Sequence, residues 1–360
     1  MTRGILSAGA YLPHRRLDRT TIAAVAGQGG GKGSRTVASY DEDSTTMAVA
    51  AARLALQATG SSRPDSLWFA TTAPAYLDKT NATAIHAALR LHRRAAAFDV
   101  VGSVRSTVAA LQAALGTAGT ALAVAADLRS GLPGSGEEAS GGDGAAAVVV
   151  GDGPGIAEVL GWGSATEEFL DRWRTPGEPR SKLWEERFGE GRYSVLAVEA
   201  YTDALKAAGV TADEVTRVAV AGPHNRAVAG SAAKLAGDKA ADGLTAGVGN
   251  TGAAHPLLLL TSLLEGAEPG QVLVLLVLAD GADALVLRTT EAIAAWQSAD
   301  PIAGQLAGGA PIPYGKYLTW RGFLPVEPPR RPEPARPSAS AAGRSADWKF
   351  GFVGSEGAGG

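Results

Sequence analysis

Apolar residues along this chain follow two patterns, short uninterrupted runs and longer stretches with helical spacing. The uninterrupted runs have the length of strands covered on both faces, and they are 121–126, 218–221 and 272–278. Residues 46–56 instead have helical spacing, because Met47, Ala50 and Leu54 fall on one face and Ser44 precedes them as an N-cap. Strands that alternate with helices through most of the length predict an α/β fold with buried sheets.

Similar segments occur in the same order in two parts of the chain. Residues 143–150 and 280–287 are each a tight glycine turn followed by an apolar strand. Upstream of each, a small-residue turn at 102–104 or 249–251 leads into an apolar helical stripe. A shared order of this kind indicates an internal duplication. The predicted halves, and the segment that follows them, are 1–165, 166–299 and 300–360.

The composition changes beyond residue 300. Proline cannot continue a helix or donate a hydrogen bond within a central strand, and six prolines occur here among arginines: Pro325, Pro328, Pro329, Pro332, Pro334 and Pro337. Aromatic residues flank them on both sides, at Tyr314, Tyr317, Trp320 and Phe323, and at Trp348, Phe350 and Phe352. A disordered tail has few aromatic residues. We therefore expect an extended proline-rich arm whose aromatic ends dock on the folded body or on a partner.

Charge and hydropathy exclude several classes of function. With a net charge of -3 and a pI near 6.0, the chain has no basic surplus for binding nucleic acid. The longest apolar stretch, 272–279, is far below the roughly 20 residues that span a bilayer, so we expect a cytoplasmic protein without a membrane segment. The absence of cysteine excludes disulfides and zinc-thiolate sites, and we see no metal-ligand spacing among the five histidines. We expect no metal and no cofactor.

The segment Phe98-Asp99-Val100-Val101-Gly102-Ser103-Val104 lies where an apolar strand gives way to a small-residue turn and then a helix. It resembles the nucleophile elbow of the thiolase superfamily, in particular the 3-hydroxy-3-methylglutaryl-CoA synthase and ketoacyl-ACP synthase III branch, whose pattern is Phe-Asp, four small or apolar residues and then Cys. Here Val104 occupies the position of the nucleophile. The resemblance covers residues 1–290 and implies a thiolase-like five-layer αβαβα fold with two duplicated halves.

Two further motifs match this branch. Pro223-His224-Asn225 follows an apolar strand, where the family has its catalytic histidine, and Gly249-Asn250-Thr251-Gly252 matches a turn whose Asn donates to the thioester oxygen. The resemblance also implies an oxyanion hole formed by the backbone amides of Val104 and Gly281. Structural alternatives exist for both side chains, because a lone His is often a satisfied core or surface residue and Asn in a turn often bonds the nearby backbone. His255, on the helix after the turn, is expected to be structural.

The glutamate that serves the synthase branch as general acid/base has no match in this chain. Its local counterpart, residues 71–79, contains no Glu, and the acidic residues 41–43 precede a helix, where carboxylates favour the N-terminal dipole. Residues 169–177 and 184–188 resemble the Asp-Phe-Trp-Arg region of that branch and would also suit an amphipathic helical lid. Without the Cys and the Glu, hydroxymethylglutaryl-CoA synthesis is not expected.

Three hypotheses for the function remain open. The first is an acyl-thioester enzyme that works without covalent catalysis, in which His224 and Asn250 stabilise an enolate during decarboxylation or C–C bond formation or cleavage. The second is a catalytically silent subunit that docks or shapes an active partner. The third is a condensing enzyme whose cysteines were removed, which the native codon at position 104 would reveal.

Partners follow from the same resemblance. The substrate would be an acyl group carried on CoA or on an acyl carrier protein. The family fold implies a homodimer, or a heterodimer with a thiolase relative. The arm at 300–360 resembles a linker that leads to a zinc-ribbon and OB-fold module in some relatives, so a separate module of that kind is a candidate partner. No paired cysteines begin such a module near residues 354–360.

Overall fold

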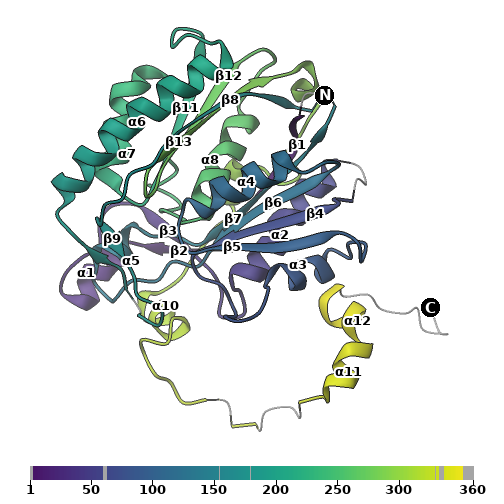
Figure 1. The fold of residues 1–360 in the computed structure, drawn as a ribbon. Coiled ribbons are helices and arrows are strands. Elements are labelled where there is room, and N and C mark those ends of the chain that lie inside the picture. Colours follow the sequence, from purple (N-terminus) through teal and green to yellow (C-terminus); the bar gives the residue numbers. More distant parts are fainter. Residues whose placement is uncertain are drawn as a thin grey trace.

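The computed structural model describes residues 3–59, 63–153, 155–178, 180–328, 330–331 and 336–351. Its centre is a sheet in the order β11-β12-β13-β8-β1-β7-β6-β4-β5 (Figure 1). The strands from the first part of the chain are β1 (Arg3–Tyr11), β4 (Ser66–Thr71), β5 (Ala96–Val101), β6 (Ala121–Asp127) and β7 (Gly144–Asp152). Those from the second part are β8 (Ala157–Ala165), β11 (Val215–Ala221), β12 (Val272–Leu278) and β13 (Ala282–Thr289). The three apolar runs in the sequence are confirmed as β6, β11 and β12.

Helices pack on both faces of this sheet and form separate layers. The helices that pack on it are α2 (Ser44–Gln57), α3 (Ala82–Ala88), α4 (Ser106–Gly116), α6 (Glu186–Ala208), α7 (Asn225–Leu235) and α8 (Ala254–Glu265). Helices α2 and α3 cover the outer face of β1, β4, β6 and β7, whereas α6 and α7 cover the outer face of β8, β11 and β13. Between the two parts of the sheet lie α4 and α8, and α8 contacts strands of both (Figure 1). The αβαβα layering of a thiolase-like fold is thereby confirmed.

The second part of the chain repeats the order of the first. β1-α2-β4-α3-β5-α4-β6-β7 corresponds to β8-α6-β11-α7, the turn at 249–252, and then α8-β12-β13. Where the first part has β5 beside β4, the second part has a single bridge, between Ala240 and Val218 of β11. Strand β8 pairs with β13 along its length and with β1 at only two positions. Because the parts share one sheet, the boundaries after 165 and 299 stay a prediction.

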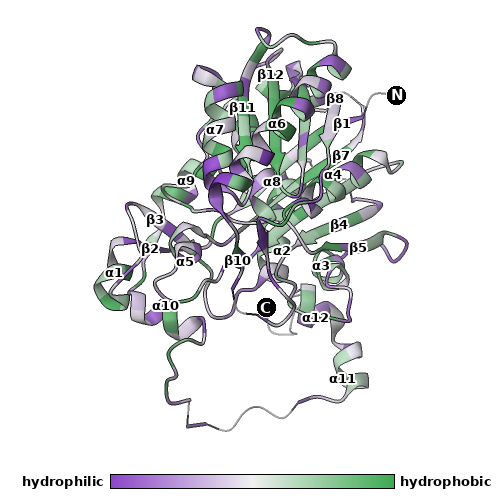
Figure 2. Cartoon of the chain, turned by 60° about the vertical axis from the view of Figure 1, so that its left-hand side comes forward, coloured by the Kyte–Doolittle hydropathy of each residue, from purple (hydrophilic) through white to green (hydrophobic). Residues whose placement is uncertain are grey.

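Local sequence accounts for the individual elements. Strands β11 and β12 carry the strongest hydrophobic colouring (Figure 2), because both of their faces are covered by helices. The predicted helix at 46–56 is α2, but its N-cap is Asp43 rather than Ser44. The Asp43 carboxylate accepts from the backbone N–H of Thr46, and the Thr46 hydroxyl accepts from the backbone N–H of Asp43, which forms a capping box. Ser44 is itself the first helical residue.

The segment after residue 300 begins on the body of the protein. It contains α9 (Ile302–Ala307), β14 (Ala310–Pro311) and α10 (Tyr314–Trp320). β14 joins β2 (Arg15–Asp18) and β3 (Ser34–Val37) in a small sheet beside α1 (Thr20–Ala26). Tyr314 and Tyr317 are buried in a cluster with Leu17, Ile22 and Val37. The expected docking of the first aromatic group is confirmed for these two tyrosines.

The rest of the arm is extended and then helical. Pro325, Pro328 and Pro337 are in neither helix nor strand, whereas Pro329, Pro332, Pro334, Phe352 and 354–360 lie outside the described residues. Two short helices follow, α11 (Ala339–Arg344) and α12 (Ala346–Gly351), and α12 packs against α3. Trp348 is 68% exposed, so it does not dock on the folded body, and its docking on a partner stays a prediction. Among the described helices, none combines the length and the hydrophobicity needed to cross a bilayer.

Candidate functional site

Val104 lies in the turn between β5 and α4. Gly102 begins the turn with a φ of 129°, a conformation that residues with a side chain rarely adopt. The Asp99 carboxylate accepts from the backbone N–H groups of Asn81 and Ala82 at the start of α3, so the Phe-Asp part of the motif anchors a helix. Val104 is only 6% exposed, and it faces a cavity of about 590 Å³. We call this space the 104 cavity; its walls include Thr72, Val104, Arg172, Tyr193, Pro223 and Asp280.

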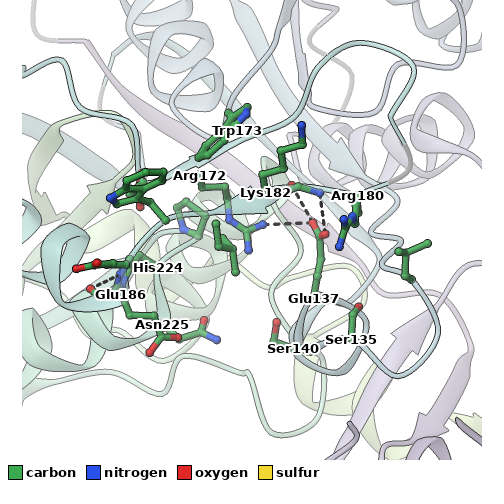
Figure 3. A pocket seen from close by; sticks show the side chains of 18 residues that line it. Ser135, Glu137, Ser140, Arg172, Trp173, Arg180, Lys182, Glu186, His224 and Asn225 are labelled. Atoms are coloured by element: carbon green, nitrogen blue, oxygen red, sulfur yellow. Dashed lines mark hydrogen bonds and ion pairs between the residues drawn. The ribbon is translucent and has the colours of Figure 1, made fainter. Parts of the chain in front are cut away.

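His224 lines a second cavity, of about 670 Å³, which we call the 224 cavity (Figure 3). The two cavities share a wall formed by Asp171, Arg172, Trp173, Ser181 and Pro223. A smaller space between them is lined by Val104 and Asn250 together. Val104 and Asn250 are therefore brought together, whereas the His224 side chain lies on the other side of the shared wall.

Both ring nitrogens of His224 bind backbone groups. Nδ1 accepts from the N–H of Ala227 at 3.1 Å, which makes His224 the N-cap of α7. Because Nδ1 accepts, the ring proton is on Nε2, which donates to the carbonyl of Glu186 at 3.0 Å (Figure 3). The ring thus joins the start of α7 to the start of α6. This is the structural role that the sequence left open as an alternative, and a catalytic role stays a prediction.

Asn250 is also held by the backbone. Its Nδ2 donates to the carbonyl of Gly222 at 2.7 Å, and its Oδ1 accepts from the N–H of Gly252 at 3.0 Å. An amide nitrogen carries two hydrogens, so these contacts leave one hydrogen of Nδ2 for another acceptor in the space shared with Val104. The predicted role of Asn250 as a donor to a thioester oxygen is compatible with this geometry.

Gly281 lies in the tight turn between β12 and β13. Arg105, the residue after Val104, donates to the carbonyl of Asp280 at 2.8 Å and pairs with Asp283 at 2.8 Å. Since the C=O and N–H of a trans peptide point in opposite directions, Arg105 fixes the direction of the Gly281 N–H. The side chain of Arg105 thus links the turn after Val104 to the turn that contains Gly281. This contact does not test the prediction that the backbone N–H groups of Val104 and Gly281 form an oxyanion hole.

The segment between residues 169 and 188 is not the predicted helical lid. It contains a short hairpin, β9 (Arg172–Trp173) and β10 (Lys182–Leu183), that crosses the site before α6 begins. Glu137, on α5 (Gly136–Ser140), holds this hairpin: its carboxylate accepts from Arg172 at 3.2 Å and from both the backbone N–H and the hydroxyl of Ser181 at 3.1 Å (Figure 3). Burial lowers the pKa of Arg172, and the Glu137 charge opposes that effect.

Two acidic residues near Val104 were missed by sequence reasoning. Asp171 and Asp280 both line the 104 cavity, with the hydroxyl of Tyr193 between them. That hydroxyl donates to Asp171 at 3.4 Å and accepts from the backbone N–H of Asp280 at 3.3 Å. Burial raises the pKa of Tyr193, and partial burial together with the charge of Asp171 raises the pKa of the Asp280 carboxyl. The signals in the sequence are the Asp-Gly turn at 280, which also marks the start of a strand, and the segment 169–177, which contains Asp171.

The turn that carries Asn250 rests on buried polar residues. Asp127 accepts from the backbone N–H of Ala253 at 2.7 Å, and His255 Nδ1 lies 3.4 Å from the N–H of Thr251. His255 is fully buried, and this burial lowers its pKa to about 4. Its expected structural role is consistent with these contacts. Among the described residues, no group of three or more His, Asp and Glu side chains is arranged to hold a metal ion.

Comparison with known proteins identifies relatives of the whole chain. No family model matches it. The hydroxymethylglutaryl-CoA synthase of Aeropyrum pernix is 30% identical over 344 residues, which are 90% of this chain and 95% of that protein. The corresponding synthase of Picrophilus torridus is 27% identical over 343 residues, covering 89% and 97% of the two chains.

Solved structures share the fold. 3-Oxoacyl-(acyl carrier protein) synthase III of Pseudomonas aeruginosa matches with a TM-score of 0.70 and 23% identity, over 81% of this chain and 99% of that one. MvaS in complex with 3-hydroxy-3-methylglutaryl coenzyme A matches with a TM-score of 0.74 and 22% identity, over 94% of each chain. The curacin HMG synthase in complex with acetyl donor-ACP has a TM-score of 0.74 and 20% identity, over 89% and 88%. From its identity to the Aeropyrum synthase over nearly the full length of both chains, this protein belongs to the hydroxymethylglutaryl-CoA synthase family, as a member that has no cysteine.

Proposed function

We propose that this protein binds acyl thioesters, carried on CoA or on an acyl carrier protein, in the 104 cavity and acts on them without forming an acyl-enzyme. The observation that carries the proposal is that the position of the lost nucleophile still opens onto a cavity of about 590 Å³, whose walls combine apolar surface with polar side chains such as Thr72 and Arg172. MvaS binds a CoA thioester and the curacin synthase binds an acyl carrier protein, which supports both carriers. Valine cannot attack a thioester, so covalent catalysis is excluded at this position.

The proposed chemistry is stabilisation of an enolate. When a malonyl-type thioester loses CO2, the electron pair of the broken C–C bond passes to the adjacent carbonyl, whose oxygen becomes negative. The proposed donors to that oxygen are Asn250 Nδ2 and the backbone N–H of Val104, two residues that line one space together, with Gly281 N–H as a further donor. His224 would join only after its ring gives up the carbonyl of Glu186 or the N–H of Ala227.

The test is decarboxylation of malonyl-CoA, followed as acetyl-CoA formation by chromatography, together with the intact mass of the protein after incubation with acetyl-CoA. We expect turnover without any gain in mass. Asn250→Ala should lower the rate by about 10²-fold, the usual cost of losing an oxyanion donor, while Gln297→Ala, whose side chain lines a separate space, serves as a control. Turnover that is unchanged in Asn250→Ala would refute the assignment of Asn250.

A second candidate is a catalytically silent subunit, and the contacts of His224 favour it. Both nitrogens of the His224 ring bind backbone groups, one at the start of α7 and one at the start of α6, so neither nitrogen is left for a substrate. If calorimetry shows that acetyl-CoA binds but malonyl-CoA is never decarboxylated, the silent subunit is the better assignment. If acetyl-CoA does not bind either, the proposed action on acyl thioesters fails, and a silent subunit that docks an active partner is the assignment that remains.

We also propose that the chain works in the cytoplasm as a homodimer or paired with a thiolase relative. The support is the edge of the sheet: β5 is its last strand, and Phe98 and Val101 on that strand are 46% and 50% exposed. An apolar edge strand offers unpaired backbone groups to a second chain. The extended part of the arm remains a candidate attachment for a separate zinc-ribbon and OB-fold module.

A further inference from the structure

We infer that Asp280 is the catalytic base of the 104 cavity, the residue that takes a proton from the carbon next to the thioester carbonyl of a bound acyl-CoA. This inference rests on the proposed function. Asp280 is exposed to the cavity, and the hydroxyl of Ser103, one residue before Val104, hydrogen-bonds to its carboxyl. The carboxylate therefore stands beside the position at which an acyl group would meet residue 104.

Two other carboxylates near the site already accept several hydrogen bonds each. Glu137 accepts from Arg129, Arg172 and Ser181, and Asp127 accepts from the backbone of Thr72 and Ala253 as well as from two threonine hydroxyls. Because these carboxylate oxygens already have several donors, the two residues hold the hairpin and the Asn250 turn in place.

Asp280 differs because Arg105 and Tyr193 bind its backbone, which leaves Ser103 as the hydrogen-bond partner of its carboxyl. Arg105 donates to the Asp280 carbonyl and forms its salt bridge with Asp283, and the Tyr193 hydroxyl accepts from the Asp280 N–H. No salt bridge among the described residues involves the Asp280 carboxyl. The charged groups that act on it are Asp171, Glu168 and Arg105, and the first two favour uptake of a proton.

The backbone of Asp280 is also unusual. Its φ is 49°, in the left-handed region that residues other than glycine occupy at some cost. Arg105 and Tyr193 fix the peptide groups on both sides of the residue in that conformation. Conformations of this kind persist where surrounding contacts impose them, often at functional sites. Here the contacts with Arg105 and Tyr193 hold the backbone of Asp280 so that its carboxylate faces the cavity.

The proposed step is balanced within the site. The C–H bond beside the thioester carbonyl breaks, the proton passes to the Asp280 carboxylate, and the electron pair moves onto the carbonyl oxygen as an enolate. The reverse step returns a proton from the carboxylic acid to carbon, and exchange of that acid with water replaces it. In D2O, acetyl-CoA bound by the protein should therefore exchange its methyl hydrogens for deuterium.

The experiment measures two quantities for the full-length wild type, Asp280→Asn and Asp78→Asn: binding of acetyl-CoA by calorimetry, and deuterium uptake by acetyl-CoA by mass spectrometry. Asn is isosteric and tolerates left-handed backbone. Asp78 is a matched control because it too has a left-handed φ, 57°, yet is absent from the walls of the 104 cavity. We expect Asp280→Asn to bind acetyl-CoA but to lose exchange by about 10²-fold or more, the typical effect of a positioned base, and Asp78→Asn to match the wild type.

The outcomes separate the inference from the proposed function. If acetyl-CoA binds but exchange is absent, or persists in Asp280→Asn, the inference is overturned while the proposed binding function stands. If acetyl-CoA does not bind the wild type, the proposed function fails and the inference falls with it. A second measurement uses the absence of native cysteine: in Val104→Cys, adding Asp280→Asn should speed alkylation of the single thiol by iodoacetamide about tenfold near neutral pH, because a neighbouring negative charge disfavours the thiolate. An unchanged rate would overturn the placement of the Asp280 charge beside residue 104.

Discussion

The buried His255 predicts a pH-dependent stability. The folded protein lowers the pKa of this ring from its ordinary value of 6.5 to about 4, because burial penalises the charged form. In the unfolded chain the ring takes up a proton as the pH falls below 6.5, whereas in the folded chain it stays neutral down to about 4. The unfolded state therefore binds more protons within this window. The contribution of His255 to stability is complete above pH 6.5 and is lost as the pH falls toward 4.

The difference between the two pKa values corresponds to about 3 kcal/mol. His255→Gln removes the titration while keeping a polar side chain, so its free energy of unfolding should depend much less on pH across this window. The loss of stability in the wild type should also weaken function, since His255 lies against Thr251 in the turn that carries Asn250.

The assay is urea denaturation followed by circular dichroism at several pH values from about 7.5 to about 4.5, where linkage predicts the change. The control is His14→Gln, which makes the same substitution at an exposed histidine. Equal slopes of unfolding free energy against pH in the wild type and His255→Gln would refute the reasoning.

Three further outcomes follow from other parts of the molecule. His224→Ala should destabilise the protein by about 1–2 kcal/mol through loss of the α7 N-cap, and His224→Asn should recover much of that loss. Thermal unfolding measures the stability of both variants, and equal melting temperatures would contradict the capping role. Val104→Cys should alkylate faster than free cysteine, since the N-terminus of α4 favours a thiolate, and should gain an acetyl group from acetyl-CoA; a thiol inert to both reagents would count against an accessible site. Val101→Lys, on the exposed edge of β5, should lower the molar mass measured by light scattering from that of a dimer to that of a monomer, whereas Val195→Lys, exposed on α6, should not. A wild type that is monomeric at micromolar concentration would contradict the dimer proposal.

The sequence by itself determined the elements and their order. Continuous apolar runs gave the covered strands β6, β11 and β12, and helical spacing gave α2, because these patterns reflect which faces of a local segment lose contact with water. The elbow at 98–104 and the turn at 249–252 were also visible locally, since glycine and small residues mark places where the backbone must bend sharply. The sequence alone also shows that position 104 has no nucleophile, because it is a valine.

Tertiary structure decided how the side chains are used. The pattern placed His224 after a strand, but only the approach of α6 supplies the Glu186 carbonyl that, with the N–H of Ala227, occupies the ring. Glu137 meets its hairpin partners, and Asp280 meets Ser103, across long separations in the chain. Such contacts depend on how layers pack, and the free energy that decides them comes from burial and from partners that no local window contains.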